Sequence, residues 1–317
     1  MHKHRIILEN FDLEEGKISF SKLHDLQEKL TALAEGAVLS LVQGKSKPGR
    51  GKKPRWMREV LDFQLVGLNP GSTILEVEAK EIGQVYKNKQ FALFDGPEAE
   101  LLLQESAFGL TSFVIDKAIK EPQGSEMLDK YILQKITEFE KLLDSDQSQI
   151  LLLSNGQSNV REAKIKYESL KQISIAEQKI PEPVKTAIVG VLDVMRHQKE
   201  QMEIVATTGQ RIRAFPGTNL KIRKLKRFFG EKVKVTGLAH FKADRKLKYI
   251  EILNIQKADA EEKTTEELTL PIFEDLDLKR LAREQSWQGF DEKKFKKNIQ
   301  ELEIEETPEE LLALLKE

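Results

Sequence analysis

Five short strand-like segments in the second half of the chain constrain its fold more than any other feature. They cover residues 184–194, 203–207, 211–215, 232–241 and 246–255. Turns separate them, and a basic segment with helical apolar spacing lies between the third and the fourth. Pro181 and Pro183 come just before the first strand, where prolines indicate a linker. We therefore predict a small separate β domain over residues 181–257.

The order of these elements narrows the fold of this domain further. Strand, strand, strand, helix, strand, strand is the order of the oligonucleotide/oligosaccharide-binding (OB) barrel, a five-stranded Greek-key barrel. Gly190 and Gly237 fall inside two of the strands. Glycine at such positions allows the bulges and bends that close a small barrel. The sequence predicts an OB-like five-stranded β-barrel.

The first 95 residues predict an α+β domain. A strand over residues 5–11 and a short strand over 17–20 precede a long helix, with Ser21 as its N-cap. The apolar residues of this helix recur every three or four positions: Leu23, Leu26, Leu30, Leu33, Ala37 and Leu41. Two strand-like runs then flank Asn69-Pro70-Gly71, which is strong turn chemistry and predicts a β-hairpin.

The remaining segments complete an overall α+β fold. Residues 96–180 predict a helical segment, with helices over 97–119 and 125–143, followed by a short β pair over 150–154 and 163–170. Residues 258–317 predict an acidic, partly helical tail. Thr307 and Pro308 there have the pattern of a capped helix start.

The sequence lacks the motifs of several kinds of catalytic and metal-binding site. The chain has no cysteine, which excludes disulfides and thiolate chemistry. It has no glycine-rich phosphate loop and no G-x-S-x-G elbow, and its five histidines have no metal-ligand spacing. We expect a non-enzymatic protein without cofactor or metal. The N-terminus lacks a secretory signal and no apolar run approaches ~20 residues, so we expect a cytoplasmic protein without membrane contact.

Charge is distributed unevenly along the chain. The whole chain has 51 basic and 52 acidic residues, but residues 257–317 alone hold 18 acidic and 10 basic ones. The part before them is therefore basic. A basic body with an acidic tail fits anionic partners or intramolecular masking, and the alternative is a solvated helical tail.

A basic loop over residues 44–58 follows the first long helix. We expect it to stay extended and to reach phosphates, because its first residues are polar, glycine or proline. The alternative is a flexible solvated connector. Its candidate nucleic-acid contacts are Lys45, Lys47, Arg50, Lys52, Lys53, Arg55 and Trp56.

A second basic region lies in the predicted barrel. OB barrels bind single strands in a basic groove beside aromatic side chains. The candidate contacts here are Arg211, Arg213, Arg223, Lys224 and Arg227. Phe228 and Phe229 follow them, and the alternative role for these two rings is to cap the bottom of the barrel.

Spaced aromatic residues and a leucine-rich terminal helix mark the acidic tail as a candidate partner-binding segment. The candidate anchors are Trp287, Phe290, Phe295, Leu311, Leu312 and Leu315. The alternative is that the tail packs against the basic body of its own chain.

Four parts of the sequence together resemble a family of uncharacterised bacterial proteins: the N-terminal strand and helix, the loop R-G-K-K-P, the hairpin L-N-P-G-S-T-I-L-E-V-E and the run G-E-K-V-K-V-T-G-L-A-H-F. That family is associated with two-gene operons whose second product is a nuclease toxin or a defence component. The resemblance implies an antitoxin-like protein that binds a basic partner through its tail. The alternative hypothesis is a DNA- or RNA-binding protein that uses the basic loop and the barrel.

Overall fold

The computed structural model describes most of the chain up to residue 258. The described residues are 1–13, 17–49, 51–69, 73–86, 99–122, 127–155, 160–196, 201–206, 209–217, 220, 225–242 and 246–258. They all belong to one compact unit, Met1–Leu270. The predictions for the acidic tail lie outside the described residues.

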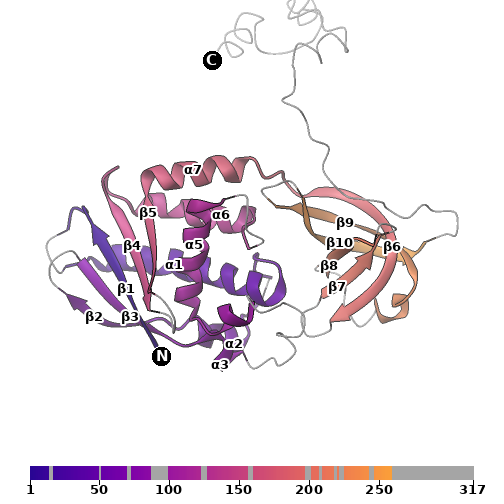
Figure 1. Cartoon of the computed structure of the whole chain (residues 1–317), viewed down its shortest axis with the longest axis horizontal. Coiled ribbons are helices and arrows are strands. Elements are labelled where there is room, and N and C mark those ends of the chain that lie inside the picture. The colour runs from indigo at the N-terminus through magenta and orange to yellow at the C-terminus, as the bar shows by residue number, and fades with distance from the viewer. Residues whose placement is uncertain are drawn as a thin grey trace, which may run out of the picture. The chain divides into compact units, whose positions relative to one another are not determined.

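A five-stranded antiparallel sheet forms the centre of the first 180 residues, in the order β2-β3-β1-β4-β5 (Figure 1). The strands are β1 His2–Glu9, β2 Gln64–Asn69, β3 Thr73–Ala79, β4 Gln149–Asn155 and β5 Val160–Lys166. β2 and β3 pair antiparallel, which confirms the predicted hairpin. β4 pairs with β1, so the β pair predicted in the middle of the chain extends the N-terminal sheet.

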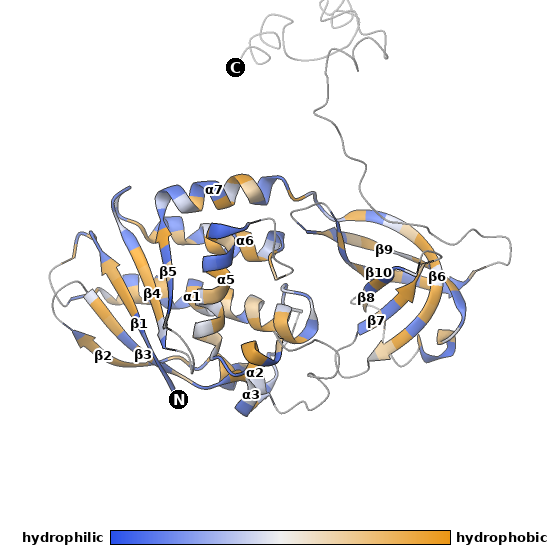
Figure 2. Cartoon of the chain, viewed as in Figure 1, coloured by the Kyte–Doolittle hydropathy of each residue, from blue (hydrophilic) through white to orange (hydrophobic). Residues whose placement is uncertain are grey.

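Helices cover one face of this sheet (Figure 1). The longer ones are α1 Phe20–Gln43, α5 Ala107–Lys120, α6 Lys130–Thr137 and α7 Tyr167–Gln178, and shorter ones are α2 Arg55–Val60, α3 Ile82–Val85 and the 3₁₀ turn η1 Glu138–Leu142. Apolar segments alternate with polar ones along α1 and α5 (Figure 2). Leu26, Leu30 and Leu33 of α1 join Ile6 and Leu75 of the strands in one core, as the spacing of the leucines predicts.

The start of α1 corrects one expectation. Residues 17–19 are not a strand, and the N-cap is Ser19 instead of Ser21. The Ser19 side chain accepts a hydrogen bond from the Lys22 backbone N–H at 3.2 Å. Ser19 serves as the cap and Phe20 is the first helical residue, so residues 17–20 have no continuous stretch left for a strand. α1 ends at Gly44, whose φ of 78° suits glycine.

Two further expectations from the middle of the chain were wrong. A single helix over 97–119 is interrupted at residues 104–106, and α5 begins anew after its N-cap Ser106. The predicted strand over 163–170 ends at Lys166, because Leu170, Ile173 and Ala176 lie three residues apart and bury one face of α7.

Residues 184–257 form a closed five-stranded barrel in the order β10-β8-β7-β6-β9. The strands are β6 Val184–Arg196, β7 Gln201–Val205, β8 Arg211–Pro216, β9 Lys232–Phe241 and β10 Leu247–Lys257. β8 and β10 pair parallel, and the other neighbours pair antiparallel. The close pairing of β9 with β10 requires glycine at position 237, because a Cβ there would lie 2.3 Å from the Glu251 carbonyl oxygen.

The basic segment between β8 and β9 ends in a 3₁₀ turn, η2 Lys226–Phe228. Phe228 packs into the barrel core and is 5% exposed, which agrees with its alternative role as a cap. Phe229 is 58% exposed and does not cap the barrel. Among the helices that the structure describes, none is long and apolar enough to cross a membrane.

Candidate functional site

The loop after α1 runs directly against the barrel. A Cβ added to Gly44 would lie 3.7 Å from the Phe215 ring and 4.0 Å from the Arg213 guanidinium group. The Lys45 Nζ lies 5.3 Å from the centre of the Phe215 ring, within the range of a cation–π contact. The two basic regions that the sequence predicts separately therefore meet at β8.

Asp129 connects three elements at this meeting point. It is the N-cap of α6 and accepts a hydrogen bond from the Ile132 backbone N–H at 3.0 Å. The Ser46 hydroxyl, from the loop after α1, donates to the same carboxylate at 2.6 Å. The Lys248 ammonium, from β10, donates to it at 2.7 Å. One buried carboxylate thus fixes the loop and the barrel to the start of α6.

The surroundings of Asp129 keep it ionised. Burial alone would raise its pKa, but the charge of Lys248 and the hydrogen bonds from Lys248, Ser46 and Ile132 outweigh burial and hold the pKa below the usual range. A buried carboxylate that lost its cationic partner would be strongly destabilising. Asp129 therefore acts as the internal counter-ion of Lys248.

Aromatic rings fill the space beside this ion pair. Phe215 meets Tyr249 edge to face with centroids 5.2 Å apart, and Tyr249 stacks on His240 at 4.4 Å. Burial lowers the pKa of His240, although Glu251 at 3.8 Å opposes this shift. Phe215 is only 2% exposed, so its ring has no free face on which a nucleic-acid base could stack.

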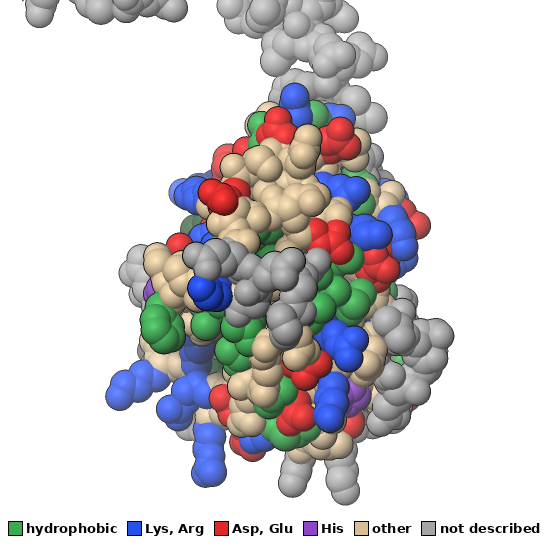
Figure 3. Space-filling model, turned by 90° about the vertical axis from the view of Figure 1, so that its left-hand side faces the viewer, with side chains coloured by type: hydrophobic (Ala, Val, Ile, Leu, Met, Phe, Trp, Pro, Cys, Tyr) green, Lys and Arg blue, Asp and Glu red, His purple; other side chains and the backbone are tan. Residues whose placement is uncertain are grey.

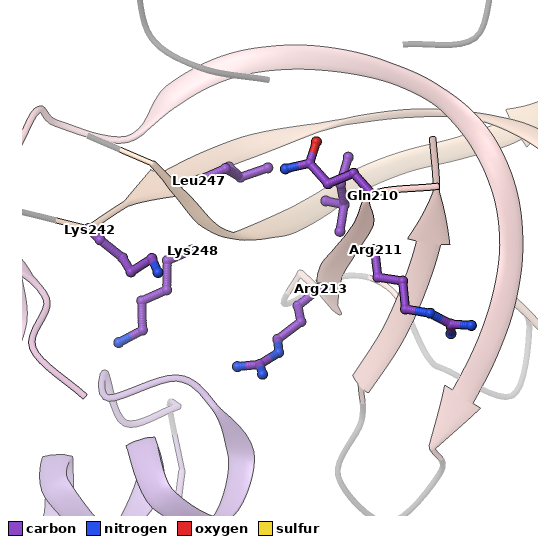
Figure 4. A pocket seen from close by; sticks show the side chains of 7 residues that line it. Gln210, Arg211, Arg213, Lys242, Leu247 and Lys248 are labelled. Atoms are coloured by element: carbon purple, nitrogen blue, oxygen red, sulfur yellow. The ribbon is translucent and has the colours of Figure 1, made fainter. Parts of the chain in front are cut away.

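A pocket of about 160 Å³ opens beside the ion pair, between the start of β8 and the β9–β10 turn. Arg213, Lys242 and Lys248 line it, and Figure 4 shows Arg213 and Lys248 extending toward the end of α1 with Lys242 beside Lys248. Arg211 also lines the pocket, but its guanidinium group turns away from the other three (Figure 4). It pairs instead with Asp193 at 3.0 Å and Glu203 at 3.2 Å.

The loop adds two lysines to this region. Lys45 lies over Phe215, and the charge of the exposed Lys47 reaches His240 and lowers its pKa. We call the basic side chains from both segments the junction cluster. It consists of Lys45, Lys47, Arg213, Lys242 and Lys248.

The second half of the basic loop leaves the junction. Lys53 pairs with Glu35 of α1 at 2.8 Å, and Trp56 packs against Tyr86 with ring centres 4.7 Å apart. The expectation of one extended loop over residues 44–58 is wrong at its end, because Arg55–Val60 form α2. Buried Ser46, paired Lys53 and packed Trp56 also anchor the segment to the body of the protein. Lys52 and Arg55 are exposed.

The other candidate residues divide into two groups. Arg227, on η2, stacks on Phe228 at 4.7 Å. The rest lie outside the described residues: Arg50, Arg223, Lys224, Trp287, Phe290, Phe295, Leu311, Leu312 and Leu315.

Sequence reasoning missed Lys242, Lys248, Ser46 and Asp129. Asp129 carries a local signal, since aspartate before an apolar helical run is a common N-cap. Nothing local connects it with Lys248, which lies 119 residues further along the chain.

A serine–histidine pair lies at one end of the sheet. The Ser106 Oγ and the His4 Nε2 are 2.8 Å apart, and Ser106 also accepts from the Gly109 backbone N–H at 3.0 Å. Burial and then the charge of His2 lower the pKa of His4 to about 3. Ser106 is completely buried and serves as the N-cap of α5.

No group of three or more potential metal ligands occurs among the residues that the structure describes. No family model, curated protein or solved structure matches this chain.

Proposed function

We propose that the junction cluster of this protein binds nucleic acid. The cluster would contact the phosphate backbone of the nucleic acid. The observation that carries the proposal is the convergence of cations from two distant segments. Lys45 and Lys47 come from the loop after α1, while Arg213, Lys242 and Lys248 come from the barrel. Closely placed lysine and arginine side chains neutralise successive phosphates and release their counter-ions, which drives such binding.

The strand order of the barrel supports the same ligand. Counted from β6, the order is first, second, third, fifth, fourth, with a parallel pair between the third and fifth strands. This order agrees with that of OB barrels, in which the second and third strands and the loop between the fourth and fifth bind oligonucleotides. Arg213 lies on the third strand, and Lys242 and Lys248 flank that loop.

Nearby carboxylates set the size of the electrostatic effect. Asp129 neutralises Lys248, and Asp193 and Glu203 neutralise Arg211. Lys45 and Lys47 of the loop add their charges beside Arg213 and Lys242 of the barrel. We expect three to four phosphate contacts, which gives log Kobs against log salt a slope of about −2 to −3 for a single strand.

The test measures fluorescence anisotropy of labelled single-stranded RNA, single-stranded DNA and duplex DNA between about 50 and 200 mM salt. Arg213→Glu and Lys242→Glu should each weaken binding several-fold and make the slope shallower. The control is Lys171→Glu. Lys171 is exposed on α7, and its substitution changes the net charge by the same amount as Arg213→Glu or Lys242→Glu. Absence of binding at low salt, or equal loss in all three variants, would remove the proposal.

The antitoxin-like role stays a separate prediction, because its anchors lie outside the described residues. Deletion of residues 258–317, followed by purification from the native host, tests whether a protein partner is lost with the tail.

A further inference from the structure

The two edges of the five-stranded sheet differ in charge. β5, at one edge, has a charged residue at four of its seven positions: Arg161, Glu162, Lys164 and Lys166. Charges of this kind prevent edge strands from pairing with other chains. β2, at the opposite edge, reads Gln-Leu-Val-Gly-Leu-Asn and has no charged residue. Its edge lacks the protection that β5 has.

β2 also exposes large apolar side chains. Leu65 is 49% exposed, Val66 53% and Leu68 41%. Figure 3 faces the side of the molecule on which the sheet lies and shows apolar side chains and charges of both signs on that side. β2 pairs only with β3 among the described strands, so one side of its backbone is left to bond with another chain.

An irregularity in β2 places both leucines on one face. Leu65 is opposite Val77 and Leu68 is opposite Leu75, and the register shifts by one residue between Leu65 and Gly67. Val77 and Leu75 both belong to the core on the helix-covered face of the sheet. Leu65 and Leu68 are three positions apart and would face opposite sides in a regular strand, but the shift directs both to the helix side.

The sequence of β2 is complementary to itself in the antiparallel direction. With a two-fold axis between Val66 and Gly67, Leu65 lies opposite Leu68 of the second copy, and Gln64 lies opposite its Asn69. Residues directly opposite each other in an antiparallel pair point to the same face of the sheet. Leu65 and Leu68 meet this condition, because the register shift in β2 places both on one face. No charged side chain opposes a like charge in this arrangement, because β2 has no charged residue, whereas β5 carries three cations and one anion.

We propose that β2 is a dimerisation edge that pairs antiparallel with β2 of a second copy of this chain. The pairing joins two five-stranded sheets into one continuous sheet, with the helices of both copies on the same face. Four leucines, two from each copy, form two cross-strand pairs and become covered. The contact is isologous, since the same strand serves both partners.

Paired charge variants of the full-length chain test the register. Leu65→Lys with Leu68→Lys places lysine opposite lysine at both cross-strand pairs and should yield a monomer. Leu65→Lys with Leu68→Glu places lysine opposite glutamate at both pairs and should restore the dimer. Both changes are at exposed positions, so both variants should fold. Sedimentation equilibrium measures the masses, and Glu162→Lys on β5 is the control that should leave the dimer intact.

Cysteine cross-linking gives a second readout, which the absence of native cysteine makes unambiguous. A mixture of Leu65→Cys and Leu68→Cys chains should form disulfide-linked heterodimers on mild oxidation. Each variant alone should cross-link poorly, because its own cysteines lie three residues out of register. A wild-type chain that stays monomeric at about 100 µM overturns the proposal. So does a dimer that the two-lysine variant leaves unchanged.

Discussion

Lys248 and Asp129 form an ion pair at 2.7 Å in which both side chains are almost fully buried, at 5% and 10% exposure. The pair joins β10 of the barrel to the N-cap of α6, and the Ser46 hydroxyl adds the loop after α1 to the same carboxylate. Because the ion pair connects the barrel and the loop after α1 to the same helix, it holds the cations of the loop close to those of the barrel. The first prediction concerns its energetics.

Asp129→Asn should lower the free energy of unfolding by about 3 kcal/mol, because it leaves the Lys248 ammonium buried without a counter-ion. Urea denaturation measures the loss. The double variant Asp129→Asn with Lys248→Met should lose less than the two single variants combined, since it removes both charges. Additive losses would show that the two side chains do not depend on each other.

The pH dependence of this difference follows from the lowered pKa of Asp129. An aspartate whose pKa is lower in the folded state stabilises the fold above its ordinary pKa of 3.8 and loses that effect as the pH falls further. The stability gap between the wild type and Asp129→Asn should therefore be constant from pH 7 to about 5 and narrow below about pH 4. A gap that widens with acid would contradict the assignment.

His4 should make the protein sensitive to mild acid. Burial lowers its pKa to about 3, so it stays neutral in the folded state while the unfolded chain takes up a proton below 6.5. Stability should fall by a few kcal/mol between about pH 6.5 and 3, since the unfolded state binds more protons there. His4→Gln removes this titration, and its unfolding free energy should change less over that interval. Parallel pH profiles for the two proteins would exclude His4 as the cause.

Two helix caps allow a matched comparison. Ser106 caps α5 and also bonds to His4 within the core, while Ser19 caps α1 at the surface. Ser19→Ala should cost about 1 kcal/mol, the usual value for a lost N-cap. Ser106→Ala should cost about 1 to 3 kcal/mol more, because it also leaves a buried histidine nitrogen without its partner. Equal losses in thermal or urea unfolding would mean that the His4 contact adds nothing.

Local patterns predicted the barrel well. β9 has the predicted bounds, residues 232–241, because its buried and exposed side chains alternate along the whole strand. The pairing of β4 with β1 could not be predicted in the same way. Its partners, such as Ile6 and Leu152, lie far apart in the chain, and antiparallel register leaves no periodic signal across that distance. Residues 104–106 were missed because the apolar spacing continues across them.

In the candidate site, too, local patterns predicted only the residues that belong to a basic run. Lys45, Lys47 and Arg213 were found because each belongs to a basic run, which is visible in sequence. Lys242 and Lys248 lie in an ordinary strand-turn-strand segment, and only the closed barrel brings them to Arg213. Lys52 and Arg55 belong to the same run as Lys45, but the Lys53–Glu35 pair holds this part of the loop against α1. The composition of the segment identifies it as basic, but only the fold shows which of its residues lie at the junction cluster.

That separation gives the last prediction. Two double variants change the net charge equally: Lys45→Glu with Lys47→Glu, and Lys52→Glu with Arg55→Glu. All four positions belong to the basic segment 44–58. Only the first pair is at the junction cluster, so it should weaken nucleic-acid binding about tenfold or more and make the salt slope shallower by about 1 to 1.5. The second pair should change affinity by less than about threefold through long-range charge alone. Anisotropy titrations at two salt concentrations measure both effects, and thermal unfolding checks that both variants are folded. If the second pair weakens binding as much as the first, the phosphates contact the whole loop and the junction is not the site.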